Sequence, residues 1–215
     1  MIMRSLYVLV FVFSAFWSGA QETVAYSANF EFYEGVYLSF EDFRANNPLP
    51  KEGIISTVNR EDPAFYRKLF NTRSFRYFDD AGGPRNVFPE EVFGVSLRGE
   101  PFVKFGGQFC KIMVLGMLSY FAPGAGDPEV QPRFAYTGEG QSAVLGGDHF
   151  KQIIFNFETG EFADLTPEAV AGFIEDAPGL HREFLQLKRK DQRRAMYAFI
   201  QRYNKANPIY FPVRE

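Results

Sequence analysis

The sequence contains a single cysteine, Cys110, and only two histidines, His149 and His181. No disulfide can form within a chain that has one cysteine, so the fold must be held together by its apolar core. Two histidines are too few for a multi-histidine metal site, and carboxylates would have to dominate any zinc site. Cys110 lies in the apolar run 109–121, which favours a buried, inert thiol over a reactive one. We therefore expect no metal site and no cofactor.

Long apolar runs are scarce as well, and the one that stands out is at the N-terminus. Arg4 precedes an apolar stretch from Leu6 to Trp17, and Ser18-Gly19-Ala20 supplies the small residues that signal peptidase requires. The stretch is shorter than the roughly 20 residues that cross a bilayer, and no stop-transfer pattern follows it. Residues 1–20 thus predict a signal peptide and an exported protein, periplasmic or extracellular, with no transmembrane segment after cleavage.

Aromatic residues are abundant, with 26 phenylalanines and 11 tyrosines. Their alternation with polar residues is typical of half-buried strands, and a helical spacing of apolar residues follows near the C-terminus. We expect a single α+β domain over residues 21–215, built on a mostly antiparallel, Phe-rich sheet with a short N-terminal helix and C-terminal helices. A long loop at 122–148 and a helical segment at 167–206 complete this organisation.

Local motifs place several elements. Residues 92–105 and 150–165 each predict a hairpin, with turns at 98–100 and 158–161. Ser39 is positioned to cap a short helix with acidic residues in its first turn. The continuous apolar run 108–121 predicts one central strand buried on both faces, with Met113 and Met117 in the core.

Charge is unevenly distributed, although the formal net charge is only −3. Residues 21–179 carry 13 basic and 23 acidic side chains, whereas residues 180–215 carry nine and three. The polar run 188–194 covers all faces of a helix, which predicts an exposed bend or helical corner. Its basic residues are the candidate binding residues Lys188, Arg189, Lys190, Arg193 and Arg194.

The basic C-terminal region has two possible roles. It can contact an envelope protein, a glycan or an anionic surface, or it can dock on the acidic part of its own domain. Because the chain is expected to be exported, we do not expect nucleic acid as a partner.

A weak catalytic constellation lies within residues 138–149. Ser142 is followed by Asp148 and His149, the three residue types of a serine hydrolase. The sequence around Ser142 lacks the second glycine of a nucleophile elbow, and no strand precedes it. An ordinary loop is the alternative. The acidic pair 79–80 is interpreted as a solvated turn.

Four segments resemble a known group: GVYLSFEDFRANNP at 35–48, VFGVSLRGEPFVKF at 92–105, IIFNFETGEF at 153–162 and YNKANPIYF at 203–211. Together they are similar to a family of uncharacterised exported proteins of Bacteroidetes-type bacteria. The resemblance implies an envelope or extracellular setting and assigns no catalytic residue. The sequence thus favours a non-catalytic binding or scaffolding protein, with a periplasmic serine-type hydrolase using residues 138–149 as the alternative.

Overall fold

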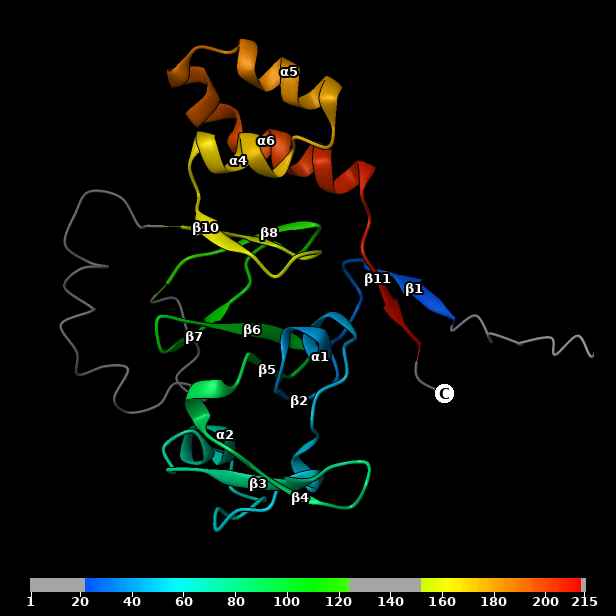
Figure 1. Ribbon diagram of the computed structural model, residues 1–215, viewed down its shortest axis with the longest axis vertical. Coiled ribbons are helices and arrows are strands. Elements are labelled where there is room, and N and C mark those ends of the chain that lie inside the picture. The colour runs from blue at the N-terminus through cyan, green and yellow to red at the C-terminus, as the bar shows by residue number, and fades with distance from the viewer. Residues whose placement is uncertain (1–21, 124–151, 214–215) are drawn as a thin grey trace, which may run out of the picture.

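The computed structural model describes residues 22–123 and 152–213. These residues form an elongated stack of layers (Figure 1). Three helices lie at one end, a three-stranded sheet lies below them, a four-stranded sheet follows, and a small helix with a two-stranded sheet lies at the other end. Every strand pair is antiparallel. The α+β class, with Phe-rich antiparallel sheets and C-terminal helices, is confirmed.

The four-stranded sheet has the order β2-β5-β6-β7. Its strands are β2 (Gly35–Tyr37), β5 (Gly94–Leu97), β6 (Glu100–Phe105) and β7 (Gln108–Lys111). Arg98 and Gly99 connect β5 to β6 with φ angles of 53° and 78°. Positive φ at both positions is the geometry of a two-residue hairpin turn, so the predicted hairpin is confirmed.

Both faces of this sheet are buried. Phe102 on β6 faces one layer of the core, while its neighbour Val103 faces another, as the two-residue period of a strand requires. Cys110 on β7 lies on the same side as Val103 and is fully buried, which confirms the prediction of a buried thiol.

The three-stranded sheet has the order β10-β9-β8. Its strands are β8 (Leu118–Phe121), β9 (Ile153–Asn156) and β10 (Phe162–Asp164). β9 and β10 form the second predicted hairpin, in which Gly160 has a φ of 77°. Ile154 faces the helices, whereas Phe155 faces the four-stranded sheet.

A layer of aromatic rings fills the space between the two sheets, and we call it the ring layer. Phe155 and Phe162 stack with ring centroids 4.7 Å apart. Helix α1 (Phe40–Arg44) contributes Phe43, which is fully buried. The helix begins at the predicted cap, because the Ser39 hydroxyl accepts from the Asp42 amide and the Asp42 carboxylate accepts from the Ser39 amide. The buried rings of the ring layer are Phe32, Tyr37, Phe43, Phe121, Phe155, Phe157 and Phe211.

The chain ends also meet at the ring layer. Strands β1 (Thr23–Ala25) and β11 (Tyr210–Pro212) pair in a two-stranded ribbon beside the stack (Figure 1). Phe211 is fully buried against Phe30, with ring centroids 4.5 Å apart. The C-terminal strand therefore completes the core between the sheets.

A smaller unit covers the outer face of the four-stranded sheet. Its elements are the 3-10 turns η1 (Lys51–Gly53) and η2 (Pro89–Glu91), helix α2 (Phe65–Leu69), and strands β3 (Phe75–Phe78) and β4 (Pro84–Val87). In the β3–β4 turn, the Asp79 carboxylate accepts from the Gly83 amide and pairs with Arg85. The Arg85 guanidinium holds the pKa of Asp79 below its usual value. These contacts are those of a solvent-facing turn, as expected for residues 79–80.

Three helices cover the three-stranded sheet, and we call them the helical cap. They are α4 (Pro167–Phe173), α5 (Pro178–Gln186) and α6 (Arg189–Ala206). α4 begins where Thr166 accepts a hydrogen bond from the Ala169 amide. The layer below the cap, which we call the helix-covered layer, includes Ile154, Phe184 and Ile200.

One side chain attaches α6 to the sheet edge. The Asn204 carboxamide accepts from the Leu118 amide at 2.7 Å and donates to the Leu118 carbonyl at 2.8 Å. It thereby takes the place of a neighbouring strand beside β8. Gly116 permits this approach, because a Cβ there would lie 2.3 Å from the Asn204 side chain.

The prediction of one strand over 108–121 was wrong. β7 ends at Lys111 and β8 begins at Leu118, in the other sheet. The run is apolar throughout because each short strand is buried, although in a different layer, and the segment between them crosses from one sheet to the other. Met113 lies on this crossing and is 55% exposed, so its assignment to the core was also wrong, whereas Met117 packs against the core as predicted.

Candidate functional site: a basic face on the helical cap

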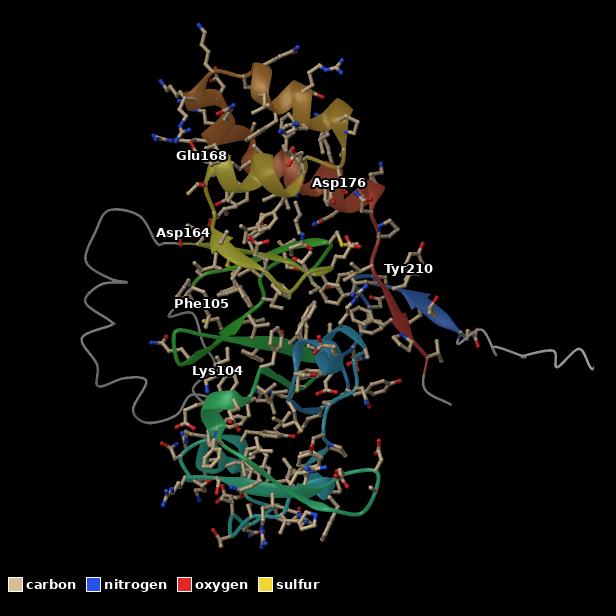
Figure 2. The ribbon with its side chains drawn as sticks, in the orientation of Figure 1. Lys104, Phe105, Asp164, Glu168, Asp176 and Tyr210 are labelled. Atoms are coloured by element: carbon tan, nitrogen blue, oxygen red, sulfur yellow. The ribbon has the colours of Figure 1, made fainter. Side chains whose placement is uncertain are left out.

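The run 188–194 forms the corner at which α5 turns into α6. α5 ends at Gln186, Leu187 and Lys188 have extended backbones, and α6 begins at Arg189. Lys188, Arg189, Lys190, Arg193 and Arg194 are all exposed. Nitrogen-bearing side chains extend into solvent from this end of the molecule (Figure 2). The predicted helical corner is therefore present.

Ion pairing divides the basic residues of α6 into two groups. Arg189 pairs with Glu168 on α4, and Arg202 donates two hydrogen bonds, of 2.7 and 2.6 Å, to Glu183 on α5. The bond from Arg202 holds the pKa of Glu183 below its usual value. Arg189 thus pairs with the acidic part of the domain, one of the two roles considered for the basic region, whereas Arg202 and Glu183 both lie within the basic region itself.

The other cations of the corner have no such partner. Within residues 22–123 and 152–213, Lys188, Lys190, Arg193 and Arg194 make no ion pair or side-chain hydrogen bond. The same holds for Lys205 near the end of the helix. Within the described residues, these exposed charges therefore face solvent and are available to an external anion.

An exposed tyrosine continues this face, and the sequence analysis did not single it out. Tyr197 follows Arg193 and Arg194 by four and three residues, so the three side chains lie on one side of the helix. Its ring is 39% exposed and lies 5.4 Å from that of Tyr120 on β8, and its hydroxyl donates to Gln152. The i+3 and i+4 spacing was a usable signal, but only knowledge of which side of α6 is buried reveals the exposure.

A separate hollow of about 650 Å³ lies at the edge of the four-stranded sheet. Phe93 and Phe162 form apolar parts of its wall, with Glu90 and Glu91 nearby. Lys104, labelled in Figure 2, also lines it and donates to the Pro89 carbonyl. Burial lowers the pKa of Lys104, while the Glu90 charge acts in the opposite direction. The hollow has room for a small molecule, but its lysine already has a backbone partner.

A second hollow, of about 480 Å³, is lined by Asp42, Asp79 and Asp80. Asp42 is held in the α1 cap and Asp79 by Arg85, so two of the three carboxylates have partners within the fold. No group of three or more His, Cys, Asp or Glu side chains suited to a metal ion occurs in the described part of the chain.

The candidate hydrolase residues Ser142, Asp148 and His149 lie outside the described residues, as do the predicted signal peptide at 1–20 and nearly all of the predicted loop 122–148. The other histidine, His181, is on α5 and is partly exposed. Among the described helices, none combines the length and apolar character needed to span a bilayer.

Comparison with known proteins assigns this chain to no family. No family model, curated protein or solved structure matches this chain.

Proposed function

We propose that the mature chain is an exported, non-catalytic protein that binds an anionic component of the cell envelope through the corner of α6. Export is inferred from the N-terminal sequence, and binding from the cations at the corner. The observation that carries the proposal is that Lys188, Lys190, Arg193 and Arg194 are exposed and pair with no acidic side chain among residues 22–123 and 152–213.

The helical cap gives these cations a fixed arrangement. α6 is attached by its buried face, which includes Ile200, by Asn204 and by the Arg202–Glu183 pair. A rigid helix presents its charges without the ordering cost that a disordered basic tail would incur on binding. The surface therefore suits a partner whose negative charges are also spatially arranged.

The test uses protein beginning at Gln21 and two anionic probes. One probe is vesicles containing phosphatidylglycerol, with phosphatidylcholine vesicles as the neutral control, and the other is polygalacturonate. The variant carries serine at Lys188, Arg189, Lys190, Arg193 and Arg194.

Wild type should bind at least one anionic probe, and binding should weaken as salt is raised from low to moderate concentration. Each basic residue near a charged surface contributes up to about 1 kcal/mol, so the variant should lose most of the binding. Equal behaviour of the two proteins toward both probes would refute the proposal.

A further inference from the structure

Three exposed cations of α6 lie along one side of the helix, two near its start and one near its end. Lys190, Arg194, Tyr197, Gln201 and Lys205 are all exposed. Their spacings of four, three, four and four residues keep them on one side of the helix. We call this row the α6 stripe. At about 1.5 Å per residue, its ends are about 22 Å apart.

The acidic partners of α6 lie away from the α6 stripe. Glu168 binds Arg189 from α4, and Glu183 binds Arg202 from α5. The acidic side chain of the helix itself is Asp191, which lies on the flank that also carries Arg202 and precedes Arg194 of the α6 stripe by three residues. The α6 stripe itself contains three cations, a tyrosine and a glutamine, with no carboxylate.

A membrane surface fits the α6 stripe poorly. A helix that binds in the plane of a bilayer buries an apolar face in the headgroup region. The apolar face of α6, which includes Met196, Phe199 and Ile200, is instead buried in the helix-covered layer. The exposed side offers Tyr197 and small residues such as Ala198, so contact with lipid would depend on charge alone.

An extended acidic polysaccharide fits the same features better. Its carboxylates recur along the chain, so one chain can meet Lys190 and Arg194 near one end of the α6 stripe and Lys205 at the other. The half-exposed ring of Tyr197 offers an apolar surface for the C–H face of a sugar ring, and the carboxamide of Gln201 can both donate to and accept from hydroxyl groups. The hydroxyl of Tyr197 is held by Gln152, which fixes the ring beside Arg193 and Arg194.

We propose that the α6 stripe binds a linear, carboxylate-bearing polysaccharide along the helix axis, with Tyr197 stacking on a sugar ring. This inference rests on the proposed function and narrows its partner. Chain length therefore matters, because a short oligomer engages only part of the row.

The experiment measures binding of galacturonate oligomers of increasing length to the full mature chain, with anionic vesicles and a single-stranded oligonucleotide as competing probes. Lys190→Ser/Arg194→Ser should weaken polygalacturonate binding about ten-fold, as expected for two exposed charge contacts. Arg73→Ser/Arg76→Ser is the matched control, since both arginines are exposed at the other end of the stack, and it should bind as wild type does.

Variants of Tyr197 distinguish recognition of a sugar ring from attraction by charge alone. Tyr197→Phe should retain binding to polygalacturonate. Tyr197→Ala should bind polygalacturonate several-fold more weakly than wild type, while its affinity for the anionic vesicles should change little. Equal effects of the two double variants, or unchanged binding by Tyr197→Ala, would overturn the inference. Tighter binding of vesicles or of the oligonucleotide than of polygalacturonate would also overturn the inference. If the tighter probe is the anionic vesicle, the proposed function still stands. If no anionic probe binds, both the proposed function and this inference are refuted.

Discussion

The ring layer and the helix-covered layer are both apolar, yet different contacts hold them. In the ring layer, side chains from both sheets, α1 and the two chain ends interlock ring against ring, with a polar contact from Tyr37 to Asn46. The helix-covered layer combines aliphatic packing with polar attachments, of which Asn204 to Leu118 and Tyr203 to Asp176 are the clearest. The comparison teaches that ring packing dominates one layer, whereas the other joins its segments by apolar packing, including the Phe184–Phe199 ring pair, together with directional hydrogen bonds.

This difference has a consequence for the proposed binding surface. The α6 stripe belongs to the layer that hydrogen bonds orient, so its direction relative to the sheet depends on a few identifiable groups. The ring layer joins the two sheets to each other through ring contacts such as Phe105 with Phe121 and Phe93 with Phe155. Stability and surface geometry can therefore be disturbed separately.

The largest effect is expected from Phe155→Ala. Phe155 is fully buried, stacks on Phe162 and contacts the rings of Phe40 and Phe43. Removing a buried ring costs about 3–5 kcal/mol of unfolding free energy, because a cavity remains. Urea unfolding measures the change, and Phe78→Ala is the control, since Phe78 is 61% exposed.

The control should shift stability by less than about 0.5 kcal/mol. If Phe155→Ala does not fold, Phe155→Leu should still unfold at a clearly lower urea concentration than wild type, with an unchanged m value. A loss no greater than that of Phe78→Ala would show that the ring layer is not a principal source of stability.

A smaller loss is expected from Asn204→Ala, which tests the polar attachment of the other layer. The substitution leaves the amide and carbonyl of Leu118 without their side-chain partner. Such a loss costs about 2 kcal/mol. Amide hydrogen exchange at Leu118 should accelerate more than exchange in the neighbouring strand β9. Asn86→Ala, at an exposed position on β4, should change neither the stability nor the exchange at Leu118. Unaltered exchange at Leu118 would contradict the proposed role of Asn204.

The same contrast explains which parts of the fold the sequence could predict. The two hairpins and the Ser39 and Thr166 helix caps depend on neighbouring residues, and each was predictable from local spacing. The division of 108–121 between two sheets is accompanied by long-range contacts, such as that of Asn204 with Gly116 and Leu118, which are far apart in sequence. No local pattern encodes that contact.

The candidate site was also predictable only where local sequence decides the structure. The corner at 188–194 was predictable because its polar run leaves no apolar face to bury. Tyr197 was missed because α6 is amphipathic beyond the corner, and only the packing of Met196 and Ile200 shows which side remains exposed. Export, the family resemblance and the partner class stay predictions.

The smallest effect is expected from Tyr203→Phe, which removes the hydroxyl that donates to Asp176 at 2.9 Å. At neutral pH the loss should be about 1 kcal/mol. Burial, the hydrogen bond to Asp176 and the nearby acidic charges of Asp176 and Glu158 raise the pKa of Tyr203 above its ordinary value of 10.0. The phenol therefore ionises in the unfolded chain at a lower pH than in the folded protein.

The direction of the pH dependence follows because the Tyr203 phenol ionises at a lower pH in the unfolded chain than in the folded protein. A raised folded-state pKa stabilises the protein fully below pH 10, and this contribution declines as pH rises above 10 because the unfolded state gains by ionising. The difference in unfolding free energy between wild type and Tyr203→Phe should thus shrink between about pH 10 and 11. Tyr210→Phe is the control, since Tyr210 is 56% exposed (Figure 2), and its stability should follow that of wild type throughout. A constant difference for Tyr203→Phe across this range would mean that the hydroxyl does not join α6 to the segment between α4 and α5 through Asp176, and would leave Asn204 as the main directional contact of that layer.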